Sequence, residues 1–330
     1  MPSGVRSALL WNLNIRAARR AIDSIPAAEL NSYIVVTPHL VHLAPLATLN
    51  HGSRVRPVFV QNGLGRTDVE WLRQTCPEVP IVPLRASISN NPDSLLPHGV
   101  VIDCLAHCSD GPFCIQDADC FVTDAAFWDS VSIDTATEYA ACAFTRKARP
   151  GMPEFPETFL TCVNGKLLKQ YRSKYGITSE SSGQPPRNAQ RILAAAGYGE
   201  GRVLEKLKNY YDTLQQFWVV ASHEGYQFRR IEGEGSTVHH IGGTSYLHRS
   251  FDDLSHWDYW PLSVHYFHLR ILEIPAAARF RKRFAKLIEF HGSSSSLLSR
   301  FPEFAAGWRR RICDNILTEM ATPWRFALDA

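Results

Sequence analysis

Short apolar runs alternate with amphipathic stretches along the first 120 residues of the chain. The runs are rich in β-branched residues and predict buried strands over 32–37, 55–61, 79–84 and 111–116. The stretches between them predict helices over 5–30, 67–75 and 99–107, with a polar loop over 86–98. This alternation predicts right-handed βαβ units, and so an α/β fold with a mainly parallel sheet flanked by helices.

The pattern loosens after residue 150. A polar, turn-forming stretch over 176–188 predicts a mobile loop. The elements predicted beyond it are a helix over 211–224, a strand over 226–231 and helices over 262–290 and 301–320, with a Gly-Ser linker over 292–296 between the last two. The expected organisation is therefore an N-terminal helical segment over 1–30, an α/β domain over 31–260 and a C-terminal basic helical extension over 261–330.

The composition fits a soluble globular protein with a substantial core. Of the 330 residues, 45% are hydrophobic and 20% are charged, which excludes a disordered or fibrous chain. The formal net charge is only +3 (35 basic minus 32 acidic residues), so we expect no nucleic acid as a partner. The charge is uneven, because residues 270–330 hold 11 Lys and Arg against 6 Asp and Glu.

Cysteine usage and the apolar runs bear on the compartment. The eight cysteines are spread along the chain, as in proteins of a reducing cytosol. Four of them lie close together, but without a C-x2-C pair their spacing is poor for a structural zinc site. No apolar run approaches the roughly 18 residues of a membrane span, and the N-terminus lacks the continuous apolar stretch of a signal peptide. We therefore expect a cytoplasmic protein.

The sharpest candidate for chemistry is Asp117-Ala118-Asp119. It follows an apolar strand, and ligands of open α/β sheets bind at the carboxyl ends of the strands. Two carboxylates two residues apart can share one hard cation, so this pair predicts a Mg²⁺ or Mn²⁺ site that contacts phosphate oxygens. The alternative is a pair of solvated acids in a turn.

A second candidate lies far along the chain, at His239-His240-Ile241-Gly242-Gly243. A histidine followed closely by two glycines offers an imidazole ligand beside a backbone that can approach a phosphate. The alternative is a strand end at which one histidine packs.

Together, in this order along the chain, the motifs resemble a GT-A glycosyltransferase of the family 2-like type. The resemblance covers about residues 32–250 and includes Val58-Phe-Val-Gln-Asn-Gly, His98-Gly-Val-Val-Ile-Asp and Tyr211-Asp212-Thr213. It implies a GT-A, Rossmann-like fold and a metal-dependent transfer of a sugar from a nucleotide-diphosphate donor.

The resemblance also implies residue roles. Asp119 would ligate the metal, Asp117 would contact the metal or the donor ribose, and His240 would add a metal or diphosphate contact. The nucleoside pocket would be lined by Thr37, Pro38 and Asn62, and the diphosphate would face His98, Gly242 and Gly243. Many relatives carry an Asp after the second strand to read uracil, whereas this chain has Gln61-Asn62. An amide still hydrogen-bonds a base edge, so a UDP-sugar stays the favoured donor.

Inverting relatives use one carboxylate as the base for direct displacement, and Asp212 is the candidate here. Its alternative role is to cap the helix that follows; Glu224 and Glu232 are the alternates as base. The stretch 176–188 would order over the donor and exclude water, or is a plain surface loop.

The C-terminal helices interleave basic residues such as Arg283 and Lys286 with Phe280 and Phe284. This pattern fits a peripheral contact with anionic lipid, a docking patch for an acidic partner, or an apolar stripe packed on the α/β domain. The aromatic cluster Trp257–Phe267 suits sugar stacking or core packing.

Two other function classes compete with the transferase. A degenerate domain could keep the fold and serve as a binding scaffold without turnover. A sugar nucleotidyltransferase would need a Gly-rich basic loop after the first strand, which residues 37–40 do not supply. The acceptor, whether glycan, lipid, peptide or small metabolite, is not specified by the sequence.

Overall fold

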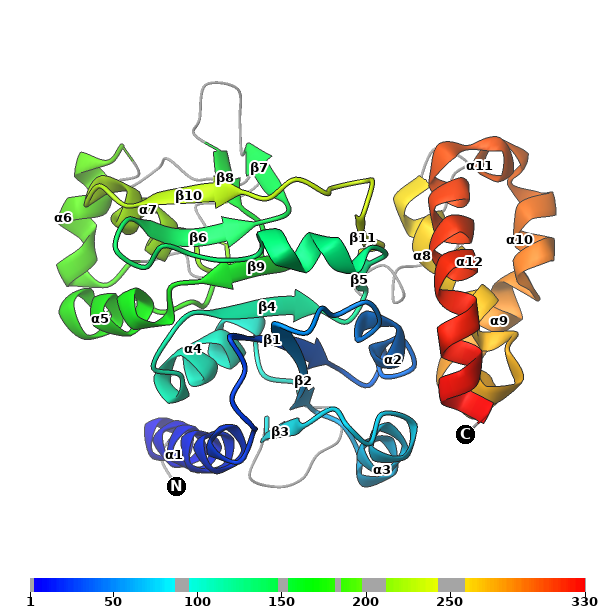
Figure 1. The fold of residues 1–330 in the computed structure, drawn as a ribbon, viewed down its shortest axis with the longest axis horizontal. Coiled ribbons are helices and arrows are strands. Elements are labelled where there is room, and N and C mark those ends of the chain that lie inside the picture. Colours follow the sequence, from blue (N-terminus) through cyan, green and yellow to red (C-terminus); the bar gives the residue numbers. More distant parts are fainter. Residues whose placement is uncertain are drawn as a thin grey trace.

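The computed structural model describes residues 3–86, 95–147, 154–181, 185–197, 212–242 and 259–329. Its centre is a seven-stranded sheet in the order β10-β6-β9-β4-β1-β2-β3 (Figure 1). The strands of this sheet are β1 (Leu30–Val36), β2 (Val55–Asn62), β3 (Ile81–Leu84), β4 (Phe113–Asp117), β6 (Glu138–Cys142), β9 (Leu160–Val163) and β10 (Gln227–Arg230). β9 runs antiparallel between β4 and β6, and the other neighbouring strands are parallel. The predicted α/β fold with a mainly parallel sheet is confirmed.

Two small sheets flank this central sheet. β5 (Cys120–Val122) pairs antiparallel with β11 (Val238–His240), and β7 (Thr145–Lys147) pairs antiparallel with β8 (Glu154–Pro156). The first of these sheets begins directly after β4, with β5. The strands of the second lie between β6 and β9 along the chain.

Alternating strand residues place two helical layers on the sheet. Tyr33 and Val35 of β1 point into a core with the helices α1 (Ser3–Asp23), α4 (His98–Cys108), α5 (Gly165–Tyr175), α6 (Arg187–Ala195) and α7 (Gln215–His223). Ile34 and Val36 point into the opposite core, with α2 (Ala44–Ala47), α3 (Arg66–Thr75) and the C-terminal helices. A third core lies under η1 (Ala125–Ser130), a 3₁₀ helix after β5. The period of two in a β-strand is the reason why one apolar run feeds both layers.

The C-terminal region is a group of helices at one side of the molecule (Figure 1). Its elements are α8 (Tyr259–Leu272), the 3₁₀ helix η4 (Pro275–Phe284), α9 (Ala285–His291), α10 (Ser294–Arg300), α11 (Pro302–Ala306) and α12 (Trp308–Asp329). The single helix predicted over 262–290 is therefore wrong, because Pro275 lacks the backbone N–H that would continue α8. The linker predicted over 292–296 is also wrong: Gly292 ends α9 at a φ of +75°, and the Ser293 hydroxyl caps α10.

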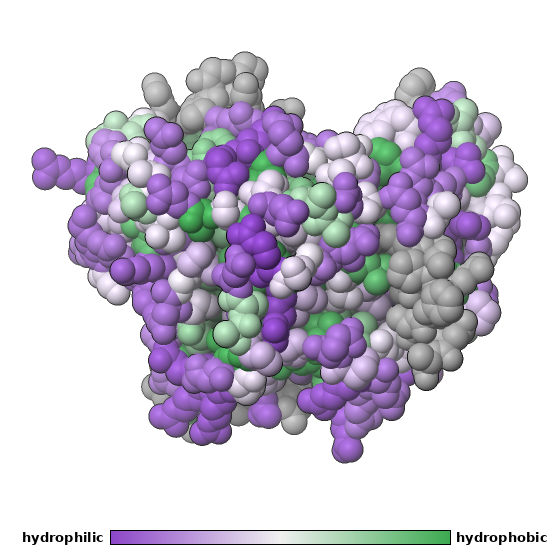
Figure 2. All heavy atoms as spheres, in the orientation of Figure 1, coloured by the Kyte–Doolittle hydropathy of each residue, from purple (hydrophilic) through white to green (hydrophobic). Residues whose placement is uncertain are grey.

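The apolar stripe of this region packs against the sheet. Phe280, Phe284 and Leu287 are buried in the same core as Ile34 of β1. Arg283 reaches Asp68 of α3 with two bonds of 3.1 and 2.9 Å, and it donates to the Pro38 carbonyl. Of the three interpretations of the C-terminal helices, the structure therefore shows the one in which the apolar stripe packs on the α/β domain. The surface in Figure 2 is mostly hydrophilic, with hydrophobic residues in small separate areas. Among the described residues, no helix is long and apolar enough to cross a membrane.

The predicted loop 176–188 is anchored where it is described. Ser179 is fully buried, and its amide and hydroxyl donate to Asp103 of α4. Gly99 permits this contact, because a Cβ at that position would collide with the Ser179 backbone. Residues 182–184 lie outside the described residues, and α6 already begins at Arg187. Ser179 is thus fixed to α4 by these contacts, and the mobility of the stretch 176–188 stays a prediction.

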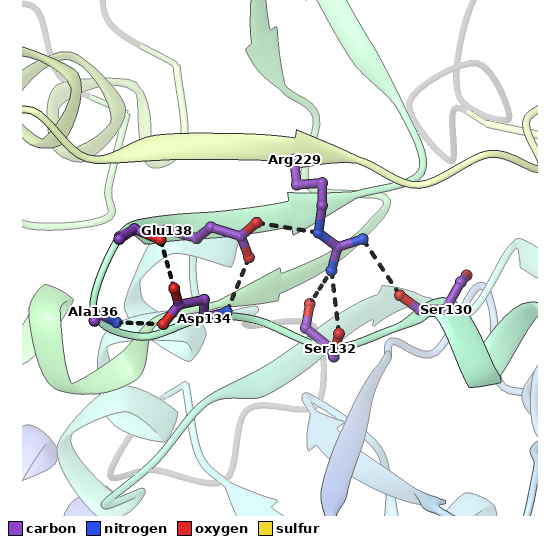
Figure 3. A network of polar contacts seen from close by, with 7 residues as sticks. Ser130, Ser132, Asp134, Ala136, Glu138 and Arg229 are labelled. Carbon is purple, nitrogen blue, oxygen red and sulfur yellow. Dashed lines mark hydrogen bonds and ion pairs between the residues drawn. The ribbon is translucent and has the colours of Figure 1, made fainter.

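Polar contacts that the sequence patterns did not reveal hold β10 and β6 at one edge of the central sheet. Arg229 of β10 reaches Glu138 of β6 at 3.1 Å and the Ser132 carbonyl at 2.6 Å, and Glu138 accepts from the Asp134 amide (Figure 3). This network ties the segment after η1 to the outer strands. The strands β6 and β9 were missed because their short runs carry no clear alternation.

Candidate active site

The Asp-Ala-Asp motif forms the turn between β4 and β5. Asp117 is the last residue of β4, Asp119 lies in the turn, and Cys120 opens β5. A buried amide fixes this turn: the Gln116 side chain donates to the Cys120 carbonyl at 2.9 Å and to a carbonyl at the end of α2 at 3.0 Å. The hydroxyl of Ser32 in β1 donates to the Gln116 side-chain oxygen at 2.9 Å. The two carboxylates therefore project from a turn whose backbone is held on both sides.

His240 is brought to this turn by the pairing of β5 with β11. In that register His240 lies opposite Cys120, and the Ile241 amide donates to the Asp119 carbonyl at 3.0 Å. The His240 Nε2 atom is 3.5 Å from Asp119 Oδ1 and 3.9 Å from Asp117 Oδ2. Phe159 stacks on the imidazole with ring centres 3.7 Å apart. One ligand atom from each of the two acids and the histidine lies within 4.8 Å of the others, so the three can hold one cation.

The charges of this cluster interact strongly. Burial raises the pKa of Asp117 to about 7, and the neighbouring Asp119 adds to the rise. Burial acts on Asp119 in the same direction, but His240 outweighs it and lowers the Asp119 pKa. Burial opposes the charge of His240, yet Asp119 raises the pKa of this imidazole above its usual range. The contacts of 3.5 to 3.9 Å are longer than hydrogen bonds, and a cluster of this charge with room between its ligand atoms suits a divalent cation.

His98 faces the same cluster from the first turn of α4. Its Nε2 atom is 3.7 Å from Asp117 Oδ1 and has no hydrogen-bond partner among the residues that the structure describes. Burial lowers the pKa of His98 to about 4, so the ring is neutral near pH 7 and can donate one hydrogen bond. A buried, unsatisfied nitrogen at this position fits a phosphate or a metal-bound group beside Asp117.

The predicted nucleoside residues lie at the adjoining strand ends. Val35 of β1 pairs with Asp117, so Thr37 and Pro38 continue from β1 beside the acidic turn. Asn62 ends β2 and is buried, and its side-chain amide makes two hydrogen bonds with the Leu96 backbone, of 3.0 and 2.8 Å. Both polar atoms of Asn62 thus hold the chain just before His98.

Asp212 lies on the other side of the cluster, with Arg146 and Glu157. Arg146 Nη1 is 3.7 Å from Asp212 Oδ2 and 3.5 Å from Glu157 Oε1. The other Asp212 oxygen accepts from the Thr213 amide, and the Gln215 side chain accepts from the Asp212 amide. Asp212 therefore makes local turn contacts at the start of α7 and also raises the pKa of His98 through its charge, although burial has the larger, opposite effect there.

The remaining predicted positions are less central. Glu224 bonds Tyr171 and Lys174, and Glu232 is exposed. Gly242 follows His240 with a φ of +78°, a conformation that favours glycine. Gly243 and most of the aromatic cluster, including the side chains of Trp257 and Trp260, lie outside the described residues.

A cavity of about 350 Å³ opens beside His240, between the small sheets and the C-terminal helices. Glu157 and Phe159 line it from the chain between β8 and β9, and Trp308 lines it from α12. Arg146 and Glu157 also line a smaller hollow with Asp212. Sequence reasoning missed Gln116, Arg146, Glu157 and Phe159. A polar Gln116 inside the apolar run before the acids was a usable signal, whereas the other three carry no motif.

Part of the chain matches a known family model. Residues 12–168 match a family model described as the StrH glycosyltransferase N-terminal domain, which supports a glycosyltransferase. The match includes β1 to β9 and the acidic turn, and ends before Asp212 and His240. No curated protein is significantly similar to the chain in sequence.

Solved glycosyltransferases show a distant likeness. The structure of GlyE from Streptococcus pneumoniae TIGR4 is 11% identical with a TM-score of 0.38, and the match covers 84% of this chain. The chain spans 64% of the length of that GlyE structure. An active-site mutant of LgtC is 10% identical with a TM-score of 0.35, over 79% of this chain and 95% of LgtC.

Proposed function

We propose that the chain is a metal-dependent glycosyltransferase of the GT-A type, family 2-like, that uses a nucleotide-diphosphate sugar. The observation that carries the proposal is the group Asp117, Asp119 and His240 at the carboxyl end of parallel strands. Its two acids lie in the segment that matches the glycosyltransferase family model. Ligands of such sheets bind at this edge, and two buried acids held next to each other favour a cation between them.

The residues of the cluster divide the work on the donor. Asp117, Asp119 and His240 hold Mn²⁺ or Mg²⁺, with carboxylate oxygens as the ligands that these ions prefer. The bound ion stabilises the negative charge that develops on the departing nucleotide diphosphate. His98, neutral and with an unsatisfied nitrogen, donates a hydrogen bond to a diphosphate oxygen, and the Gly242 backbone approaches the same group.

The nucleoside lies over the ends of β1 and β2, against Thr37 and Pro38. Asn62 shapes this pocket by holding Leu96, because both of its polar atoms are already bonded there. The donor base is uracil in this proposal, read by groups other than the Asn62 amide.

Asp212 is the proposed base for the acceptor hydroxyl. Its Oδ2 atom lies 3.7 Å from Arg146 Nη1, and this ion pair orients the carboxylate. A base opposite the leaving group leads to direct displacement with inversion. The anomeric configuration of the product, read by proton NMR, tests this stereochemistry. The competing candidate is a binding scaffold that keeps the donor site without turnover.

Thermal unfolding with UDP, GDP, CDP and dTDP, each with and without Mn²⁺, tests the donor site. A nucleotide at 100 times its dissociation constant adds about 2.7 kcal/mol, which raises Tm by about 5–10 °C. We expect this rise with UDP, only with Mn²⁺, and its loss in Asp119→Asn.

The control is Asp110→Asn, which makes the same chemical change at a fully exposed carboxylate and should leave the rise intact. A folded wild-type protein that responds to no nucleotide contradicts the proposal. A response without any transfer or hydrolysis of the matching sugar nucleotide identifies the scaffold.

A further inference from the structure

None of the proposed contacts with the donor places a group in the cavity next to His240. His240 and Phe159 line it, so it adjoins the group of Asp117, Asp119 and His240. Its outer wall is α12, a helix whose residues come almost last in the chain. At about 350 Å³ the cavity is at the small end of the range for ligand pockets, about 300–1,000 Å³. This size admits a small ring system and excludes a bulky macromolecular segment.

The lining carries charges of both signs. Two arginines, Arg146 and Arg309, two acids, Glu157 and Glu234, and the imidazoles of His239 and His240 line the cavity. Arg146 lies 3.5 Å from Glu157, and Glu234 is paired with Arg230 at 3.0 Å. Sites for phosphate or carboxylate groups instead carry an excess of positive charge. The lining therefore favours an uncharged ligand with many hydroxyl groups, which carboxylates and guanidinium groups bind by hydrogen bonds.

An exposed tryptophan stands at the rim. Trp308 begins α12 and keeps 58% of its surface exposed, and the other exposed large hydrophobic residues of the described chain are leucines. The Arg309 guanidinium lies over the Trp308 ring, 4.7 Å from its centre. The flat apolar face of a sugar ring can pack on the face of the indole that Arg309 does not cover.

We propose that this cavity is the acceptor subsite and that it binds a neutral sugar ring. The ring stacks on Trp308, and its hydroxyl groups hydrogen-bond to Glu157 and Arg146. The inference rests on the proposed transferase function, because an acceptor subsite requires a donor site next to it. It adds the chemical class of the acceptor, which the sequence alone left open among glycan, lipid, peptide and metabolite.

The test uses the full chain with Mn²⁺ and UDP present and measures binding of methyl glycosides by saturation-transfer NMR and calorimetry. The probes are the methyl glucosides, galactosides and mannosides, with glucose 6-phosphate and an octyl chain without a sugar for comparison. We expect one glycoside or more to bind, at least tenfold more weakly in Trp308→Ala and with near wild-type affinity in Trp308→Phe, which keeps a stacking face. The thermal response to UDP and Mn²⁺ stays unchanged in both variants.

Each other outcome overturns the assignment. If no glycoside binds while the nucleotide response persists, the cavity is not a sugar site and the transferase proposal stands. Tighter binding of glucose 6-phosphate contradicts the neutral ligand, and binding of the octyl chain that depends on Trp308 contradicts the sugar ring. If the nucleotide response itself is missing, the proposed function fails, and the acceptor assignment fails with it.

Discussion

Two buried acidic sites in this molecule allow a comparison between a carboxylate that holds structure and one that we propose binds a ligand. Asp103 in α4 is 3% exposed and lies 2.6 Å from Arg172, and Ser179 donates to it twice. Asp119 is buried to a similar degree, but its nearest basic contact is His240 at 3.5 Å. Asp103 therefore has short contacts with both of its oxygens, whereas the contact of Asp119 with His240 is longer than these.

The neighbouring residues shift the pKa of the buried acid in opposite directions at the two sites. Burial raises the pKa of Asp103, and Arg172 and Ser179 work against the rise. Burial also raises the pKa of Asp117, but there the nearby Asp119 adds to the rise and brings it to about 7. A like charge held beside a buried acid costs stability unless a cation joins them. The acidic turn, rather than α4, is therefore the proposed binding site.

The largest expected effect is on folding. Asp103→Ala leaves Arg172 without its partner and Ser179 without its acceptor, and should lower the free energy of unfolding by about 3–5 kcal/mol. Chemical denaturation measures this loss, with Asp110→Ala as the exposed control. At denaturant concentrations below its lowered unfolding midpoint, the variant should still be stabilised by UDP with Mn²⁺. Loss of that response in folded protein would contradict the division between the two sites.

A smaller effect concerns metal binding and pH. Asp117, whose pKa is about 7 in the metal-free protein, must lose its proton to ligate the ion, and so must His240. The Mn²⁺ affinity should therefore fall about tenfold between pH 7.5 and pH 6. Titration of free Mn²⁺ by electron paramagnetic resonance measures it. Asp117→Asn should bind more weakly at pH 8 and keep only the part of this pH dependence that comes from His240; equal wild-type affinity at both pH values would refute the expectation.

The smallest effect is on the stability of the metal-free protein. Because the pKa of Asp117 is raised from its ordinary value of 3.8 to about 7, ionisation of this acid destabilises the fold. The penalty grows between about pH 3.8 and pH 7 and is lost as the pH falls back through this range. Asp117→Asn should raise the free energy of unfolding by about 1 kcal/mol at pH 8 in EDTA. The difference from wild type should become smaller at pH 5. An equal difference at both values would show that packing, and not charge, is responsible.

The sequence predicted those parts of the site that depend on residues close together in the chain. The apolar run before Asp117 identifies a strand, and the carboxyl end of that strand is where α/β sheets bind ligands, so the acidic pair could be located from the sequence. The prediction for His240 relied on a resemblance, because the residue lies more than a hundred positions further along. Glu157 and Phe159 carry no motif at all and were not predicted.

The sequence by itself determined the local elements, since strand and helix periods depend on which side chains neighbours along the chain can bury. It determined the parallel βαβ order and the position of the acids for the same reason. Only the tertiary structure decided that β9 runs antiparallel between β4 and β6, that β11 carries His240 to the acids, and that η4 packs its apolar stripe on the sheet. These are pairings between distant segments, and their free energy comes from surfaces that exist only after the chain has folded.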